Sequence, residues 1–94
     1  MNDLHFTWDP KKAASNLRKH GVSFEEASSL FRNPLSTVLP DPTHSRYEGC
    51  LLIIGHSAAG RLLLVAFTER DDQIRIISAR EASAREHREY EEHS

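Results

Sequence analysis

The segment that decides the fold is RLLLVAFTERDDQIRIISAR, residues 61–80. It holds two apolar runs, 61–68 and 74–79, on either side of a polar turn. A third run, CLLIIGHS at 50–57, precedes them across another short turn. Apolar runs of this length with turn residues between them predict three antiparallel strands that follow one another as a β-meander. Their nearly continuous apolar middles indicate that both faces of the sheet are covered.

Helical signals flank these strands. After a short strand at 5–8, Asp9-Pro10 predicts a helix start, and the helix ends at Gly21, where a left-handed cap is expected. Ser23 opens a second helix, which Asn33-Pro34 ends, so the two form a helical hairpin.

The first helix has a thin apolar stripe of Ala13, Ala14 and Leu17, and a separate polar line of Lys12, Asn16 and Lys19. Residues 35–39 read as an edge strand. The polar segment ASAREHREYEEHS, residues 82–94, reads as a third helix, for which Ser78 and Glu81 have capping-box spacing. The predicted fold class is α+β: an antiparallel β-meander with an N-terminal helical hairpin and a C-terminal helix, in one domain spanning 1–94.

Composition places the chain among ordinary globular proteins, with 38% hydrophobic and 28% charged residues in 94. No apolar run approaches a membrane span, and the N-terminus lacks the pattern of a secretory signal. A single cysteine, Cys50, cannot form an internal disulfide, which favours a reducing, cytoplasmic compartment. We therefore expect a cytoplasmic protein without membrane contact.

The charge is unevenly distributed along the chain, although the net value is only −2. Residues 10–20 carry four basic side chains and no acid, whereas residues 81–92 carry five glutamates against two arginines. This balance argues against a protein that coats nucleic acid without selectivity, but it leaves room for a local basic site. Two solvated helix faces would give the same pattern.

Arginines stand at the ends of the apolar strands. Regular pairing across the two turns places Arg61 opposite His56, Leu63 opposite Arg80 and Thr68 opposite Arg75. Arg61, His56 and Arg80 then share one face, and Arg75 and Arg70 fall on the other. A guanidinium in such a place reaches water, pairs with a carboxylate such as Glu48 or Glu69, or binds an anion such as phosphate. The alternative is that Arg75 and Arg80 only form salt bridges that hold the hairpin or the last helix.

The common nucleotide, metal and nucleophile motifs are absent from the sequence. The residues that remain suit RNA cleavage without a metal, because the ribose 2′-hydroxyl is its own nucleophile. The protein then needs to supply positive charge and proton transfer. His20, His44, Glu48 and Tyr90 are available for proton transfer, although each has a purely structural alternative.

Several blocks of the sequence resemble the BrnT family, the toxin half of a bacterial type II toxin–antitoxin pair. They are F-x-W-D-P-x-K, N-L-R-K-H-G-V-S-F-E-E-A, F-x-N-P, G-R-L-L-L-V-A-F-T-E-R and R-I-I-S-A-R, which run from about Phe6 to Tyr90. The resemblance implies a RelE-like fold and a ribonuclease that blocks translation. It also implies a cognate ribbon-helix-helix antitoxin, whose complex with the toxin binds operator DNA and represses its own operon.

With this resemblance, the residues predict a metal-independent endoribonuclease that needs no cofactor. The predicted catalytic residues are Arg61, Arg70, Arg80, His20, Glu48 and Tyr90. The predicted RNA-binding residues are Lys12, Lys19 and Arg75. A second class of function stays open, in which the protein is a non-catalytic interaction module and the same arginines hold a protein partner.

Overall fold

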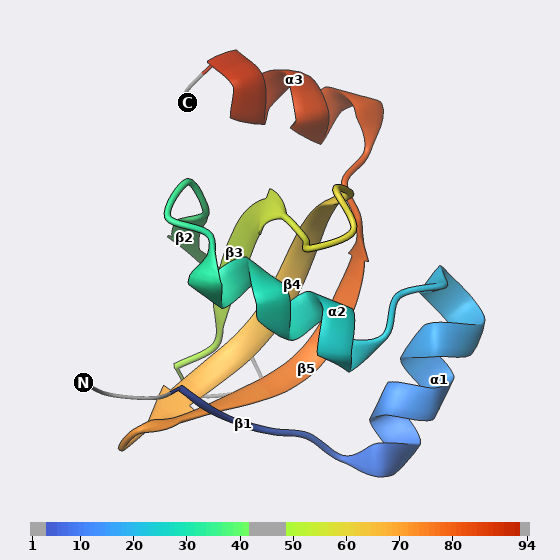
Figure 1. Cartoon of the computed structure of the whole chain (residues 1–94), viewed down its shortest axis with the longest axis vertical. Helices are drawn as coiled ribbons and strands as arrows, with labels where there is room; N and C mark the ends of the chain where they lie inside the picture. Colours follow the sequence, from blue (N-terminus) through green and yellow to red (C-terminus); the bar gives the residue numbers. More distant parts are fainter. Residues whose placement is uncertain (1–3, 42–48, 93–94) are drawn as a thin grey trace.

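The computed structural model describes residues 4–41 and 49–92 (Figure 1). Within these ranges it is an α+β fold of five strands, three α-helices and one 3-10 turn. In chain order the elements are β1 (His5–Thr7), α1 (Pro10–His20), α2 (Phe24–Ser28), η1 (Ser29–Arg32), β2 (Thr37–Pro40), β3 (Leu51–His56), β4 (Leu62–Arg70), β5 (Gln73–Glu81) and α3 (Ala84–Glu92).

The five strands form one sheet in the order β1-β5-β4-β3-β2. The pairs β2–β3, β3–β4 and β4–β5 are antiparallel. β1 pairs with β5 in parallel, so the sheet is mixed, and the expectation of a purely antiparallel sheet is wrong at this edge. A parallel pair needs a long crossover connection, and the chain between β1 and β5 supplies it with the helices and the other strands.

The strand register differs from regular pairing at two places. In β3–β4, His56 pairs with Leu62 rather than with Arg61. In β4–β5, Thr68 pairs with Arg75 as predicted, but Arg80 pairs with Leu64 instead of Leu63.

The second difference arises because Ala66 pairs with Ser78 and Phe67 with Ile76, which leaves Ile77 as an extra residue in β5. Such a β-bulge reverses the alternation of side chains beyond it.

α1 begins and ends at its predicted caps, and α2 begins at its predicted cap. The carboxylate of Asp9 accepts a hydrogen bond from the Lys11 N–H, and Gly21 ends α1 with φ 67°. The Ser23 hydroxyl caps α2 by accepting from the Glu26 N–H at 3.0 Å. The second helix is shorter than predicted, since α2 ends at Ser28 and the chain continues as the 3-10 turn η1.

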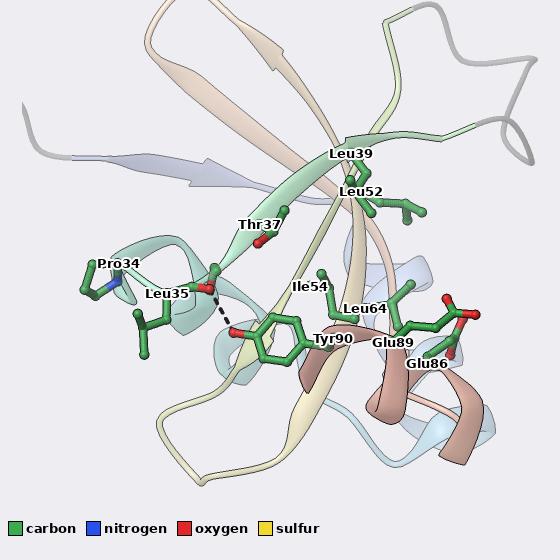
Figure 2. Close-up of a pocket in the computed structure, with 11 residues that line it drawn as sticks. Pro34, Leu35, Thr37, Leu39, Leu52, Ile54, Leu64, Glu86, Glu89 and Tyr90 are labelled. Carbon is green, nitrogen blue, oxygen red and sulfur yellow. Dashed lines mark hydrogen bonds between the residues drawn. The ribbon is translucent and has the colours of Figure 1, made fainter. Parts of the chain in front are cut away.

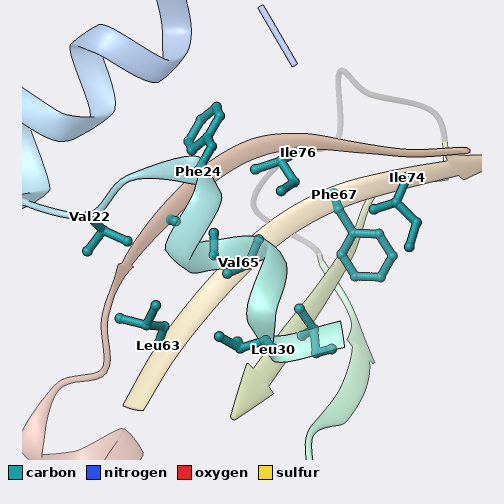
Figure 3. Packing of buried hydrophobic residues seen from close by; sticks show 11 residues of the cluster. Val22, Phe24, Leu30, Leu63, Val65, Phe67, Ile74 and Ile76 are labelled. Carbon is teal, nitrogen blue, oxygen red and sulfur yellow. The ribbon is translucent and has the colours of Figure 1, made fainter. Parts of the chain in front are cut away.

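A hydrophobic core lies between one face of the sheet and the segment formed by α2 and η1, which crosses that face (Figures 1 and 3). Val22, Phe24 and Leu30 are fully buried on the helical side of this core. The strands contribute Ile53, Leu63, Val65, Phe67, Ile74, Ile76 and Ala79.

The apolar stripe predicted for α1 holds only at Ala13, which packs against the core, and is wrong for Ala14 and Leu17. Leu17 is 52% exposed and Ala14 is exposed, whereas Asn16 is buried. Asn16 faces β5 and hydrogen-bonds to the backbone of Ala79. The polar line of the sequence therefore includes the residue by which α1 docks on the sheet.

The start of α3 also differs from the prediction. Residues 78–81 belong to β5, since they pair with β4, and the capping box is formed by Ser83 and Glu86 instead. The Ser83 N–H donates to Glu86 Oε1 at 2.8 Å, and the Glu86 N–H donates to Ser83 Oγ at 3.2 Å. Within residues 4–41 and 49–92, no helix has the length and apolar character to cross a membrane.

Candidate functional site

The site is built on the sheet face opposite α2 and η1, which we call the open face. The side chains that point to this face are those of Leu52, Ile54, Leu64 and Thr68 and of the residues paired with them in the neighbouring strands. Thr68 and Leu64 lie four residues apart on β4 and therefore point to the same side. Their partners Arg75 and Arg80 consequently share the open face, and Arg70 has the same parity as Thr68. The expectation that Arg75 and Arg80 lie on opposite faces is wrong, because the bulge at Ile77 intervenes.

Arg80 is held by a bidentate ion pair with α3. Its Nη1 and Nη2 donate to the two carboxylate oxygens of Glu86 at 2.8 and 2.9 Å, and Nη1 also donates to the Glu81 carbonyl at 3.2 Å. Arg80 lowers the pKa of Glu86 from 4.5 to about 2, against an opposing effect of burial. The Arg80 side chain is still 44% exposed. This is the salt bridge to the last helix that the alternative reading of the sequence expects for Arg80. The pair fixes the orientation of the guanidinium and leaves part of it accessible from solvent.

Beside this pair, three rings gather at the junction of β3 and α3. The ring centres of His56 and His87 lie 6.3 Å apart, and those of His56 and Tyr90 lie 5.8 Å apart. His87 Nδ1 is 3.0 Å from Glu91 Oε1, one helical turn further along α3. The His56 ring therefore lies close to both the imidazole of His87 and the phenol ring of Tyr90.

The open face is hollowed between β2 and α3 into a pocket of about 620 Å³ (Figure 2). Leu39, Leu52, Ile54 and Leu64 give it an apolar floor. Figure 2 shows the Tyr90 ring reaching across the pocket, where its hydroxyl donates to the Leu35 carbonyl at 2.8 Å. Further lining residues are Pro34, Ser36, Thr37, Glu86 and Glu89. The hydrogen bond of Tyr90 ties α3 to the chain segment just before β2.

Arg61 lies elsewhere, on the side of the sheet that carries α2. It forms a bidentate pair with Glu26 through Nε and Nη2, and its Nη2 also donates to the Gly21 carbonyl at 3.1 Å. Glu81 adds a weaker contact at 3.4 Å. The expectation that Arg61 shares a face with His56 and Arg80 is therefore wrong, because Arg61 precedes the first paired residue of β4 and turns toward the α1–α2 connection.

The Glu26 carboxylate is itself well satisfied. Ser57 Oγ donates to Glu26 Oε2 at 2.6 Å, and the hydrogen bonds from Arg61 hold the pKa of Glu26 below its usual value against the effect of burial. The same ion pair raises the pKa of Arg61. This cluster joins the α1–α2 connection to the β3–β4 turn.

The other predicted residues are scattered. Arg70 and Arg75 are exposed, and their side chains form no hydrogen bond or ion pair with the described residues. His20 and Lys19 are exposed at the end of α1, and Lys12 is partly buried near its start. Glu48 and His44 lie outside the described residues.

Sequence reasoning did not identify His87 and Glu86 as site residues. It placed His56 near the predicted arginines but gave it no catalytic or binding role. A local signal existed for α3, since His87 and Glu91 have the i, i+4 spacing that joins side chains on a helix. No local signal joins β3 to α3, because this contact depends on where α3 docks. Within the described part of the chain, no three histidine, cysteine or acidic side chains come together as metal ligands would.

Comparison with known proteins adds the family. Residues 8–86 match the model of a family described as "Ribonuclease toxin, BrnT, of type II toxin-antitoxin system". A 1.1 Å crystal structure of the Brucella abortus ribonuclease toxin BrnT shares the fold, with a TM-score of 0.68 at 24% identity over 86% of this chain and 99% of that chain. No curated protein matches the sequence. The family match covers most of the chain and contains both Arg61 and Arg80, so this chain belongs to the BrnT family of type II toxin–antitoxin ribonuclease toxins.

Proposed function

We propose that this chain is a metal-independent endoribonuclease toxin that inhibits translation, and that it binds RNA along the open face. The observation that carries the proposal is the bulge at Ile77, which gives Arg75 and Arg80 the same face as Arg70. Guanidinium groups suit phosphate because their planar fork donates two parallel hydrogen bonds. Three of them on the face that also holds an apolar pocket would form a surface that fits both the phosphates and the bases of single-stranded RNA.

The three arginines have different parts in this proposal. The register positions opposite Arg75 and Arg80 lie four residues apart on β4, or about 13 Å at the rise of an antiparallel strand. The two side chains would therefore hold different phosphates. Arg80 is the one that contacts α3, through the residue that precedes His87, so it would stabilise the phosphoryl group that reacts. Arg70 and Arg75 would bind the strand further along.

The remaining predicted residues have proposed roles that follow from their positions. Arg61 is paired with Glu26, so we propose that it positions the β3–β4 turn rather than contacting RNA. Tyr90 would support the ring cluster and the pocket. Lys12 and Lys19 on α1 would attract the RNA backbone at longer range. His20 is exposed at the end of α1, so we propose that it contributes positive charge near Lys19 rather than proton transfer, and Glu48 lies outside the described residues.

The proposed partner is a cognate antitoxin with a ribbon-helix-helix portion. It would neutralise the toxin by binding it, and only their complex would bind operator DNA. We further propose that residues 1–94 act as a single RelE-like domain in the cytoplasm. Co-purification with the product of the neighbouring short gene tests the partner. Operator binding by the complex, compared with the toxin alone, tests repression.

The direct test is cleavage of RNA by the purified protein, with and without EDTA. We expect equal cleavage in both, yielding 2′,3′-cyclic phosphate ends, and at least about a tenfold loss in Arg80→Ala. Arg32→Ala is the matched control, because Arg32 lies on the other side of the sheet over the Phe6 ring. Loss of cleavage on chelation would refute the metal-free mechanism.

The alternative, a non-catalytic interaction module, predicts a different pattern. No RNA would be cut in any condition, including on ribosomes, while the protein would still bind its partner. Expression without the antitoxin gives a second readout in cells. We expect growth arrest with the unchanged chain and relief of that arrest with folded Arg80→Ala.

A further inference from the structure

We propose that His56 and His87 are the proton-transfer pair of the RNA cleavage reaction. This inference rests on the proposed ribonuclease function and deepens it by assigning the acid and the base. The family match ends at residue 86, so His87 lies one residue beyond it. The assignment comes from the geometry of the open face.

The first argument is proximity. Glu86 and His87 are consecutive residues of α3; the former holds Arg80 and the latter approaches His56. The first turns of α3 therefore contact both Arg80 of β5 and His56 of β3 through neighbouring residues. We place the reacting phosphoryl group between Arg80 and this pair of imidazoles.

The second argument is separation. The two imidazole centres are 6.3 Å apart, too far for a direct hydrogen bond between ring nitrogens. Each hydrogen bond to an oxygen of the reacting group spans about 2.8 Å. After a small rotation of the side chains, the reacting phosphoryl group would fit between the two imidazoles, with the base on one side of it and the acid on the other. His56 is half-buried at the end of a paired strand, which fixes its backbone.

The third argument assigns the roles. Nδ1 of His87 lies 3.0 Å from Glu91 Oε1, and the tautomer with its proton on Nδ1 would donate that proton to this carboxylate. In that tautomer Nε2 is an acceptor, the arrangement by which a carboxylate prepares an imidazole as a base. We assign His87 as the base and His56 as the acid.

The reaction balances with these groups alone. His87 removes the proton of the ribose 2′-hydroxyl, and the 2′-oxygen forms a bond to phosphorus. The bond between phosphorus and the 5′-oxygen breaks, and that oxygen takes a proton from His56. The products are a 2′,3′-cyclic phosphate and a 5′-hydroxyl, with Arg80 stabilising the charge that builds on the phosphoryl oxygens.

The test uses the purified full chain and a short RNA with one cleavable linkage. We expect His56→Asn and His87→Asn each to slow cleavage by about 10²- to 10⁴-fold. The control is His5→Asn, because His5 is exposed on β1, the strand at the opposite edge of the sheet from β2. Thermal unfolding of each variant checks that the fold is kept.

A second substrate separates catalysis from packing, because the same rings could serve only to dock α3. In this RNA sulfur replaces the bridging 5′-oxygen, and a thiolate leaves without needing a proton. We expect it to restore cleavage by His56→Asn to within about tenfold of the unchanged chain, since only the acid is bypassed. His87→Asn should stay slow. Rescue of neither variant, or of the His87 variant instead, would overturn the assignment.

The failure of this inference is distinguishable from the failure of the proposed function. If the unchanged chain cuts RNA and both histidine variants cut it within about threefold of the same rate, the pair is wrong and the ribonuclease stands. If the unchanged chain cuts no RNA, free or on ribosomes, both proposals fall.

Discussion

Asn16 holds the backbone of Ala79 at two points. Its amide nitrogen donates to the Ala79 carbonyl at 2.8 Å, and its amide oxygen accepts from the Ala79 N–H at 3.0 Å. The same nitrogen also donates to the Val22 carbonyl at 2.9 Å. β1 pairs with β5 only at residues 73–75, so the edge of β5 at Ala79 has no neighbouring strand. Asn16 takes the place of that strand and joins α1 to the sheet one residue from Arg80.

We predict that Asn16→Ala destabilises the fold by about 2–4 kcal/mol, because it leaves buried backbone groups without partners. Leu17→Ala is the matched control, since Leu17 is 52% exposed and its truncation should cost less than about 1 kcal/mol. Urea unfolding of both variants measures the difference. A larger loss in Leu17→Ala than in Asn16→Ala would contradict the prediction.

These two residues show where sequence reasoning succeeds and fails. Caps are local, so Asp9, Ser23 and Gly21 could be predicted from their neighbours alone. Docking is not local: the pattern assigns Leu17 to the core because it is apolar, and it assigns Asn16 to solvent. The structure reverses both, because an amide can satisfy the exposed edge of a strand and a leucine cannot.

The same limit applies to the site. The sequence predicts arginines at the ends of the strands. The sheet face on which each of them lies depends on the bulge at Ile77, and no residue type at that position predicts a bulge. The capping box is a second case, since Ser78–Glu81 and Ser83–Glu86 have the same spacing. Pairing of 78–81 with β4 decides between them, and that choice places Glu86 against Arg80.

We predict that the Arg80–Glu86 pair makes stability depend on pH in the acid range. The pKa of Glu86 is about 2 in the folded protein and 4.5 ordinarily, so the folded state favours the ionised carboxylate. The contribution is fully present above about pH 4.5 and is lost as pH falls toward 2. Because Arg80 is 44% exposed, solvent screening limits the contribution to about 1–2 kcal/mol.

The measurement is the free energy of unfolding of the unchanged chain and of Glu86→Gln between pH 6 and pH 2.5. The difference between the two should be constant above pH 5 and shrink below pH 4.5. Glu89→Gln serves as the control, because Glu89 forms an exposed i, i+4 pair with Arg85. A difference that does not change with pH would show that the ion pair does not contribute in the expected way.

We predict that Glu26 and Arg61 act as a unit. Removing either leaves the other charge without its main partner, so Glu26→Gln and Arg61→Ala should each lower the melting temperature. The double variant should lose clearly less than the sum of the two. Thermal unfolding of the four proteins completes the cycle. Additive losses would mean that the pair contributes nothing beyond its separate contacts.

The last prediction concerns the close approach of β3 to the segment before β2. A Cβ on Gly55 would lie 2.0 Å from the Ser36 hydroxyl oxygen and 2.8 Å from its Cβ. Neither contact is tolerable, and the hydroxyl is held in place because it donates to the Leu30 carbonyl at 2.8 Å. Gly55→Ala should therefore destabilise the fold by about 1–3 kcal/mol, as overpacked sites do.

Ser36→Gly in the same chain tests the cause of that loss. It removes both clashing atoms and leaves the Ser36 Cα at 3.1 Å, a distance that a small backbone shift can relieve. The double variant should therefore unfold at a higher urea concentration than Gly55→Ala alone, even though Ser36→Gly by itself loses a hydrogen bond. A double variant weaker than both single variants would show that β3 and the segment before β2 are not packed in this way.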